Sequence, residues 1–473
     1  MKYRKNDEIR AVIDGLGNEG EGISHVDGFP FFIKDTAPGD IVTAKVMKVK
    51  SSYGYAKLLE IEQPSECRVR PECPVALKCG GCSLQHISYE EELRYKDEKV
   101  YNCLLRIGGI PAKTLDGARE PIVPSEKVFR YRNKAQCPVG RDSEGRAVAG
   151  FYSGRTHHIV PEDDCALSPA LFKVVIRTVT ELINEYGISV YNEETGKGLI
   201  RHILIRMGFG TGEIMTCIVS SGEKIPHIRE LSEALMGIPG MKSVCLNINP
   251  EKTNVILGKK IIPLMGEPFI EDILCGLRFR ISPLSFYQVN PLTAEKLYNC
   301  ALDYAGLGDA AGEAPDGGAA PKEVWDLCCG IGTITLAAAS RSDALRVHGV
   351  EIVEEAVEDA RVNAGLNGIE NADFTAAAAE EYLPRYLLDH PGSRADVVIL
   401  DPPRKGVRPE VLESITKLLP ERVVYVSCDP ATLARDLKTL LAAGYRLLKY
   451  RVFDQFSRTA HVETAVLLQR SDT

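Results

Sequence analysis

The sequence predicts an α/β protein in which a small β-barrel and a cysteine-rich middle region precede a doubly wound sheet. Strands and helices alternate from residue 323 to the C-terminus, which is typical of a mainly parallel sheet with helices on both faces. Short strands separated by Gly and Pro turns occupy the first 62 residues, and a cysteine cluster follows them. A chain of 473 residues has room for roughly two to four such domains.

The first 62 residues predict a small barrel of the OB type. Ile41 to Val46 alternates apolar and polar side chains, and Pro38-Gly39-Asp40 marks a turn before it. About five strands in so short a stretch favour a barrel, and such barrels often bind single-stranded nucleic acid. The aromatic residues of this region either stack on bases or fill the barrel core: Phe29, Phe31, Phe32, Tyr53 and Tyr55.

A metal site is predicted after the barrel, where the spacing is Cys73-x5-Cys79-x2-Cys82. A C-x2-C pair can wrap one metal centre, and the spacing alone leaves both zinc and an iron–sulfur cluster open. The fourth ligand has four candidates in the sequence: Cys67, Cys103, Cys137 and Cys165.

A basic segment with interleaved aromatics runs from residue 127 to 141 and contains no acidic residue. It is a candidate RNA contact, although a solvated strand face is an equally good interpretation. The net charge of the whole chain is −8, so any surface that binds RNA must be a local patch. The segment carries Lys127, Phe129, Arg130, Tyr131, Arg132, Lys134 and Arg141.

A nucleotide-type cofactor site is predicted at the start of the C-terminal sheet. The strand Val324 to Leu327 runs into a Gly-x-Gly turn and a helix, and Glu351 ends the next strand, about 20 residues further on. A carboxylate there is placed to accept hydrogen bonds from ribose hydroxyls. The turn lacks the third glycine of the dinucleotide fingerprint, which favours S-adenosylmethionine (SAM) over NAD.

Two later strand ends predict the chemistry. One strand ends at Asp401-Pro402-Pro403-Arg404, and another ends at Cys428, just before a helix. Amino-methyltransferases place an aromatic after the two prolines, but this chain has Arg404 there. A cysteine beside a SAM site suits a pyrimidine carbon, because C5 becomes nucleophilic only after a thiolate adds at C6. Glu463 is the best candidate for the base that then removes the C5 proton, and Arg404 and the helix at Ala431 are candidates for stabilising the thiolate.

The residues now in view resemble the RNA uracil-C5 methyltransferases, and the enzymes that act on 23S ribosomal RNA match best. The segment from Gly15 to Val26 resembles a TRAM domain, and four further segments carry the resemblance: Ser427 to Asp436, Leu400 to Arg404, Phe286 to Asn290 and His461 to Glu463. The resemblance implies a Rossmann-like SAM-dependent methyltransferase domain, an N-terminal OB-type TRAM barrel and a central α+β iron–sulfur domain. It implies Cys428 as nucleophile, Glu463 as base, SAM contacts from Gln288, Cys328, Glu351 and Asp401, and a 4Fe-4S cluster on Cys73, Cys79, Cys82 and Cys165.

The predicted domains are residues 1–62, 63–275 and 276–473. The chain departs from the family pattern at Cys328, where an aromatic is usual, at Thr333, and in a longer loop over 306–321. We expect a cytoplasmic monomer that acts on 23S ribosomal RNA, with no membrane span and no secretory signal. The same chemistry on transfer RNA and a non-catalytic iron–sulfur RNA-binding or assembly factor are the alternatives.

Overall fold

The computed structural model describes residues 3–154, 156–308 and 322–471. The chain separates into two compact units. The first contains residues 1–99, 151–160 and 456–462, and the second contains residues 100–150, 161–455 and 463–473. The predicted division into three domains stays a prediction, and most of the loop predicted over 306–321 lies outside the described residues.

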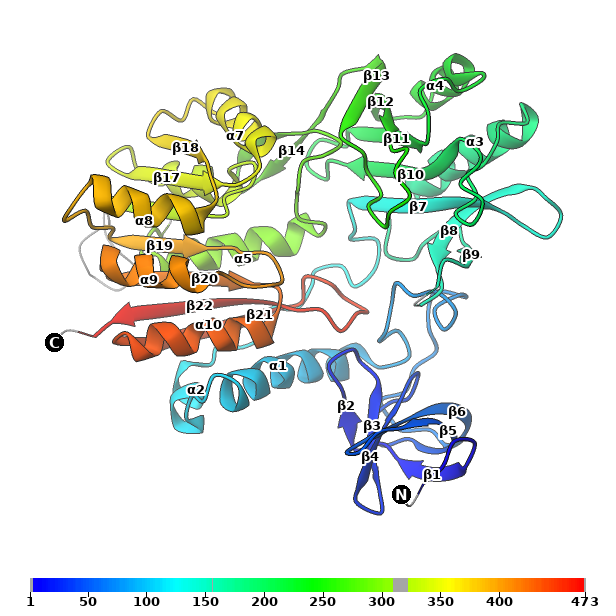
Figure 1. Cartoon of the computed structure of the whole chain (residues 1–473), viewed down its shortest axis with the longest axis horizontal. Helices are drawn as coiled ribbons and strands as arrows, with labels where there is room; N and C mark the ends of the chain where they lie inside the picture. The colour runs from blue at the N-terminus through cyan, green and yellow to red at the C-terminus, as the bar shows by residue number, and fades with distance from the viewer. Residues whose placement is uncertain (1–2, 155, 309–321, 472–473) are drawn as a thin grey trace. The chain divides into compact units, whose positions relative to one another are not determined.

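The first unit contains a six-stranded sheet in the order β1-β5-β6-β4-β3-β2 (Figure 1). β1 also contacts β3, so the sheet curls on itself as expected of a small barrel. Alternate residues of β5 are buried, which is the period of a strand with one face in a core. The strands are β1 (Glu8–Val12), β2 (Gly15–Leu16), β3 (Gly22–Val26), β4 (Phe29–Ile33), β5 (Ile41–Val49) and β6 (Gly54–Gln63).

The barrel aromatics divide into two groups. Phe31 is fully buried in the barrel core, and Phe29 packs against it. Phe32, Tyr53 and Tyr55 form a separate cluster of ring contacts, in which Tyr55 is 39% exposed. Tyr55 of the second group therefore presents part of its ring at the surface, as stacking on a nucleic acid base requires.

The middle of the chain forms a second sheet, in the order β13-β12-β11-β10-β7-β8-β9. Helices α3 and α4 contact this sheet through buried apolar side chains such as Val175, Val179 and Leu235. The elements are α1 (Tyr89–Arg106), α2 (Ala112–Ala118), β7 (Lys134–Arg141), β8 (Ala147–Tyr152), β9 (Ile159–Pro161), α3 (Leu171–Glu185), β10 (Ile200–Met207), β11 (Ile214–Ser220), α4 (Ile228–Met236), β12 (Met241–Ile248) and β13 (Lys260–Gly266).

The C-terminal part is the predicted doubly wound sheet, with strand order β18-β17-β16-β19-β20-β22-β21 (Figure 1). The first five strands in this order are parallel, and β22 runs antiparallel to both of its neighbours. The strands are β16 (Glu323–Leu327), β17 (Arg346–Glu351), β18 (Ala372–Ala376), β19 (Val397–Leu400), β20 (Arg422–Ser427), β21 (Tyr445–Phe453) and β22 (Glu463–Arg470).

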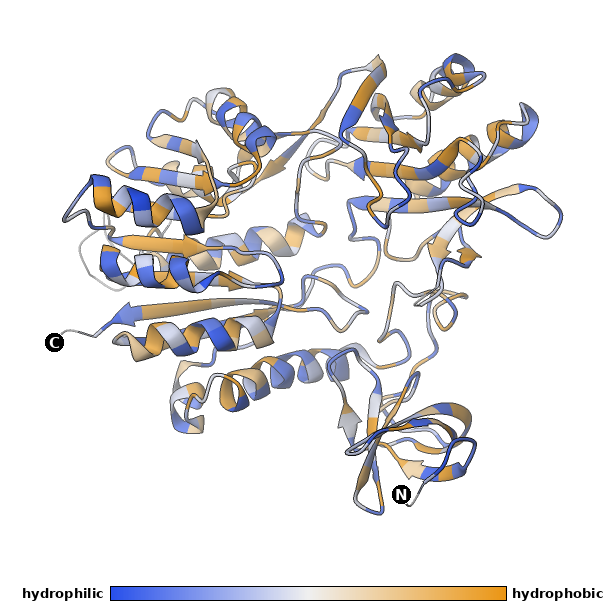
Figure 2. Ribbon diagram, in the orientation of Figure 1, coloured by the Kyte–Doolittle hydropathy of each residue, from blue (hydrophilic) through white to orange (hydrophobic). Residues whose placement is uncertain are grey.

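Helices cover both faces of this sheet. Helices α5, α6 and α7 form one layer, and α8, α9 and α10 form the other. Figure 2 shows strand β19 as a continuous hydrophobic run, which is typical of a parallel strand that is buried on both faces. A hairpin of β14 (Ile270–Leu274) and β15 (Leu277–Ile281) precedes the helices and strands of this sheet in the chain. The helices are α5 (Pro291–Tyr304), α6 (Thr333–Ala339), α7 (Glu354–Leu366), α8 (Ala379–Asp389), α9 (Pro409–Leu418) and α10 (Pro430–Ala442).

The strand order places a ligand site. The chain builds β16, β17 and β18 outward in one direction, and β19 and β20 then continue on the other side of β16. The switch point lies between β16 and β19, and ligands bind outside the carboxyl ends of the strands at such a point. Cys328 and Asp401 directly follow these two strands. None of the helices in the described part of the chain is long and apolar enough to cross a membrane.

Candidate active site

Cys428 lies in the tight turn between β20 and α10 and is partly exposed. The carboxylate of Asp429 accepts hydrogen bonds from the backbone amides of Ala431 and Thr432, both at 2.9 Å, and so caps the helix. Ser427 Oγ accepts a further bond from the Asp429 amide at 3.2 Å. These bonds hold the turn, and with it the thiol, at the carboxyl edge of the sheet.

Glu463 opens β22 and reaches the same edge. β22 pairs antiparallel with β20, and the last pair of the ladder is Ser427 with Thr464. One further step in this register sets Cys428 opposite Glu463. The Glu463 side chain is almost fully buried, and its Oε2 atom has no hydrogen-bond partner among the residues that the structure describes. A buried carboxyl with an unused oxygen is a candidate for proton transfer.

Acidic groups dominate the electrostatics of this edge. Burial and a nearby Asp326 raise the pKa of Asp401 to about 7. Burial raises the pKa of Glu463 well above its ordinary value, and Asp401 adds to this effect. Burial, with Glu463 and Asp401, also raises the pKa of the Cys428 thiol to about 12. At neutral pH Cys428 and Glu463 are therefore protonated, and Asp401 is partly protonated.

The two groups expected to stabilise the thiolate behave differently. Arg404 does lower the pKa of both Cys428 and Glu463, as an adjacent cation should. The first amides of α10, however, donate to the Asp429 carboxylate rather than to the thiol. The thiol is therefore neutral in the free protein, because burial and the two carboxyls outweigh Arg404.

The turn after β16 is held by Glu351. One carboxylate oxygen of Glu351 accepts a hydrogen bond from the Gly330 amide, and the other accepts one from the Val353 amide, both at 3.0 Å. Each oxygen keeps a further lone pair, so Glu351 can still accept bonds from a ligand. Cys328 is near Glu351, Asp401 and Asp326, and burial with these acids raises the pKa of its thiol. It is thus a small neutral side chain in an acidic pocket.

Gln288 reaches this pocket from the segment before α5. Its side chain is buried, and its Oε1 atom accepts a hydrogen bond from Gln455 at 3.2 Å. Tyr298, on α5, interacts with the side chains of Gln288 and Thr333 and is near Asp401. Burial raises the pKa of Tyr298 strongly. The structure thus connects the two predicted positions Gln288 and Asp401 through a tyrosine.

Three residues of the site were missed by sequence reasoning. Tyr298 lies within an ordinary helical pattern in the sequence. Only its contacts in the folded chain, with Gln288 and Thr333, identify it as part of the site. Asp326 is fully buried; Thr335 donates a 2.6 Å hydrogen bond to one of its oxygens, and the other oxygen has no partner in the described chain. Phe286 is 69% exposed, which is unusual for a phenylalanine and marks a ring available for stacking. In the sequence, Phe286 stands two residues before the predicted cofactor contact Gln288, and this position could have identified it as part of the site.

The predicted cluster ligands do not form a metal site in the structure. No group of three His, Cys, Asp or Glu side chains within residues 3–154, 156–308 and 322–471 is arranged to hold a metal ion. Gln85 links two of the cysteines, because it accepts from the Cys73 amide at 3.1 Å and donates to Cys82 Sγ at 3.2 Å. The Gly81 amide donates to Cys79 Sγ at 3.3 Å. Such N–H···S contacts suit thiolate ligands, so the donor chemistry fits a cluster although the arrangement of side chains does not.

Three further candidate ligands, Cys67, Cys137 and Cys165, lie outside the C-x2-C segment. Cys67 donates to the carbonyl of Pro38 and contacts Ser65 Oγ, so it is engaged in the barrel connection. Cys137 is fully buried; burial raises its pKa, and nearby Cys165 adds to the effect. Cys165 therefore has a second thiol beside it.

The basic segment is partly committed to structure. Arg130 donates to Asp164 at 2.6 Å and to the carbonyls of Cys165 and Ser168. Arg141 donates to the carbonyls of Gly145 and Ile188. Tyr131 is fully buried. Arg132 and Lys134 of the same segment, in contrast, make no ion pair with a residue that the structure describes.

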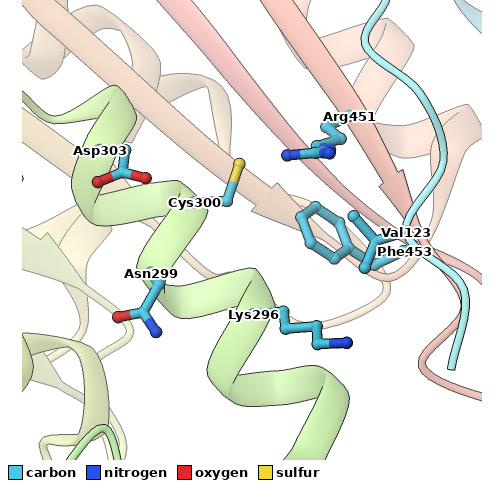
Figure 3. A pocket seen from close by; sticks show the side chains of 7 residues that line it. All are labelled: Val123, Lys296, Asn299, Cys300, Asp303, Arg451 and Phe453. Carbon is cyan, nitrogen blue, oxygen red and sulfur yellow. The ribbon is translucent and has the colours of Figure 1, made fainter. Parts of the chain in front are cut away.

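A cavity of about 310 Å³ lies between α5 and β21. Figure 3 shows Lys296, Asn299, Cys300 and Asp303 projecting from α5, with Arg451 and Phe453 of β21 and Val123 across from them. None of the predicted catalytic or cofactor residues lines it. Phe453 is the ladder partner of Glu463, so the cavity is one strand pairing away from the site rather than part of it.

Comparison with known proteins agrees with this fold. A family model described as tRNA (Uracil-5-)-methyltransferase matches residues 317–471, and one described as TRAM domain matches residues 3–59. Uncharacterized RNA methyltransferases of Clostridium tetani and Halalkalibacterium halodurans are similar over nearly the whole chain. The first is 42% identical over 99% of this chain and 97% of its own length, and the second is 44% identical over 98% and 97%.

A solved structure of a tRNA methyltransferase is similar over nearly the whole chain. The crystal structure of the Pyrococcus abyssi tRNA (uracil-54, C5)-methyltransferase in complex with S-adenosyl-L-homocysteine superimposes with a TM-score of 0.77 and 28% sequence identity. The match covers 97% of this chain and 100% of that chain. The fold, its strand-edge site and these matches define a SAM-dependent RNA methyltransferase. More narrowly, the chain belongs to the RNA uracil-C5 methyltransferase family with an N-terminal TRAM domain.

Proposed function

We propose that this enzyme methylates carbon 5 of a specific uridine in 23S ribosomal RNA, with Cys428 as nucleophile and Glu463 as base. The observation that supports the pair is the β20–β22 register, which sets the two residues opposite each other at the switch-point edge of the sheet. The two residues are 35 positions apart in the sequence, but the sheet places both at the edge where ligands bind. They can therefore act on the same substrate.

We assign the cofactor contacts to Gln288, Cys328, Glu351 and Asp401. SAM supplies an electrophilic methyl group on a positively charged sulfur. Asp326, Asp401 and Glu351 all act on Cys328, and such a group of carboxyls favours a positively charged ligand. A cation bound there also lowers the pKa of the Cys428 thiol, since it offsets the carboxyls that raise it.

Cys428 acts first. Its sulfur gives up a proton to a neighbouring carboxylate or to water and forms a bond to C6 of the uracil ring. The electrons of the C5–C6 double bond move toward the C4 carbonyl, and C5 becomes nucleophilic enough to accept a methyl group. Arg404 favours this step because it stabilises negative charge on the sulfur.

Glu463 completes the turnover. After methyl transfer C5 carries both a methyl group and a proton, and Glu463, once it has released its own proton to water, removes that proton as a carboxylate. The electrons of the C–H bond restore the C5–C6 double bond, and the Cys428 thiolate leaves. A carboxylate in a buried site is a stronger base than one in water, which suits removal of a carbon-bound proton.

We further propose a 4Fe-4S cluster with Cys73, Cys79, Cys82 and Cys165 as its ligands. The spacing of the first three residues and the N–H···S contacts around them support the proposal. Uracil methylation needs no electron transfer, so a structural role is expected. Protein purified without oxygen should contain about four iron and four sulfide per chain. Iron-free protein with full activity and unchanged melting temperature would contradict the cluster.

Transfer RNA is the second candidate substrate. The Pyrococcus abyssi enzyme acts on tRNA according to its description, and its match covers 97% of this chain, so the N-terminal barrel does not favour ribosomal RNA over tRNA. The alternative of a non-catalytic iron–sulfur RNA-binding or assembly factor is not supported, because the chain belongs to a family of SAM-dependent methyltransferases. The proposal also includes a monomer that works in the cytoplasm, with a TRAM region (residues 1–62) that binds RNA and a central region (63–275) that holds the cluster.

The deciding experiment is methylation in vitro of two unmodified transcripts, full-length 23S ribosomal RNA and a pool of tRNAs. The product nucleosides are measured by mass spectrometry. We expect 5-methyluridine in the ribosomal RNA and none with Cys428→Ala. Product in tRNA alone would overturn the ribosomal assignment, and RNA binding with no product in either transcript would overturn the enzyme assignment.

A further inference from the structure

Two cations are direct neighbours on adjacent strands of the central sheet. Lys134 opens β7, and its direct partner in the antiparallel ladder is Arg206 of β10. Residues that are opposite in such a ladder project from the same face and lie close together. Arg132 is also near, because it is one of the two cations that act on Lys134. Like charges directly opposite each other destabilise a sheet, so this arrangement needs an explanation.

No carboxylate balances this group. Neither Lys134 nor Arg132 makes an ion pair with any residue that the structure describes, and the charged groups that act on Lys134 are Arg206 and Arg132. Burial together with these two arginines lowers the pKa of Lys134 to about 7. A lysine in such a place is costly to the folded protein unless an anion joins it.

The Arg206 side chain is buried, but not all of its hydrogen-bond donors have partners. It is 3% exposed, and its Nη2 atom donates to the carbonyls of Pro283 and Ser285. Its Nε atom has no partner in the described chain. Burial lowers the pKa of Arg206 to about 10, so it stays charged. A buried guanidinium with one unused donor is an incomplete anion site.

The cations flank the segment that enters the candidate active site. Arg206 holds the carbonyl of Ser285, and the side chain of Asn133 donates to the carbonyl of Gln288 at 2.9 Å. The Asn133 amide also donates to the carbonyl of Val289 at 2.8 Å. Phe286, with its exposed ring, lies within this segment. An anion bound by Arg206 is therefore close to Ser285, the residue directly before Phe286.

We propose that Lys134, Arg132 and Arg206 form a binding site for one phosphodiester of the RNA substrate, next to the nucleotide that is methylated. The inference rests on the proposed function for the identity of the anion. Phosphate is favoured because the site combines a point charge with guanidinium donors and lies beside an exposed aromatic ring, which is the usual composition of a single-stranded RNA contact. The carboxylate of SAM is the competing anion, and the experiment separates the two.

The test compares the full-length wild type with Lys134→Met, which removes the charge and keeps most of the side-chain length. Lys242→Met is the matched control, because Lys242 is an exposed lysine on β12 of the same sheet. The probe is a fluorescent uridine-rich single-stranded RNA of twenty nucleotides, titrated at several salt concentrations. Affinity for SAM is measured separately by calorimetry, without RNA.

The phosphate site predicts four results. Lys134→Met binds the RNA about tenfold more weakly, and the slope of log K against log salt falls by about 0.7, the contribution of one phosphate on a single strand. Its SAM affinity equals that of the wild type. Its melting temperature at pH 7.5 without RNA is equal to or higher than that of the wild type, because a repelled charge is gone. Lys242→Met matches the wild type in all respects.

The pH dependence of binding gives an independent readout. RNA binds the protonated form of Lys134, so wild-type affinity falls as pH rises from 6.5 to 8.5, through the free-protein pKa of about 7. Lys134→Arg keeps its charge throughout this range and loses that decline while still binding RNA. The groups that act on Lys134 are arginines and do not titrate here.

Three outcomes would overturn the site. An unchanged salt slope in Lys134→Met would show that this residue contacts no phosphate. Weaker SAM binding with unchanged RNA binding would assign the anion to the cofactor. A lower melting temperature with proportionate loss of all binding would mark Lys134 as structural. None of these depends on methyl transfer, so failure of the proposed function, which appears as no 5-methyluridine product, stays distinguishable.

Discussion

Burial sets the reactivity of the thiol in the free protein. With a pKa raised to about 12, Cys428 is almost entirely protonated at neutral pH, and only the thiolate is a nucleophile. Its alkylation by iodoacetamide should therefore rise about tenfold per pH unit from pH 7 to 9, without levelling near the ordinary cysteine value. Arg404→Gln should slow the reaction further. Peptide mass spectrometry separates Cys428 from the other thirteen cysteines, and a plateau below pH 8 would contradict the electrostatic account.

Glu463 should matter after the methyl group has moved. Glu463→Gln keeps the shape of the side chain but cannot accept the C5 proton. We expect turnover to fall by about 10² to 10⁴, the range of a general base, while the covalent protein–RNA species accumulates. Gel electrophoresis under denaturing conditions detects that species. Loss of both turnover and the covalent species would instead place Glu463 in an earlier step.

Single residues show where sequence reasoning stops. The type and order of Cys428, Asp401 and Glu351 could be predicted, because each ends a recognisable strand. The partners of Arg130 could not, since Asp164 is 34 positions away and only the fold brings them together. The pairing of Lys134 with Arg206 has the same origin, because strand register over a long separation is set by tertiary packing.

At the scale of elements, α10 depends on its cap. Asp429 satisfies two amides at the start of the helix, and the turn that carries Cys428 is part of this arrangement. Asp429→Ala should cost about 1 kcal/mol of unfolding free energy and reduce activity more than stability. Asp429→Asn is the control, because its amide oxygen can still cap the helix. Urea unfolding and methylation assays on both variants measure the two effects.

The strand edges could be predicted from sequence, but the neighbours of each strand could not. Every predicted strand of the C-terminal sheet is present, and alternation of apolar segments with helices was the signal. The insertion of β22 between β20 and β21 is a topological fact that the pattern does not contain. It matters for function, since it is what sets Glu463 opposite Cys428.

At the scale of the whole molecule, function depends on local surfaces. The chain carries a net charge of −8, so RNA binding must come from local cations and aromatic rings. The prediction of a barrel and of a doubly wound sheet followed from composition and periodicity. The family came from motifs, whereas the RNA class did not, because a barrel and a strand-edge site serve either substrate.

The most direct test of the account asks whether Cys428 bonds to the target base. The protein is incubated with SAM and with 23S ribosomal RNA transcribed with 5-fluorouridine, in which fluorine replaces the proton that Glu463 must remove. The account predicts a stable protein–RNA adduct, with mass spectrometry locating a methylated 5-fluorouridine on the peptide that contains Cys428, and no adduct with Cys428→Ala. If the wild type methylates normal 23S ribosomal RNA but forms no adduct, or forms it at another cysteine, the central claim is wrong.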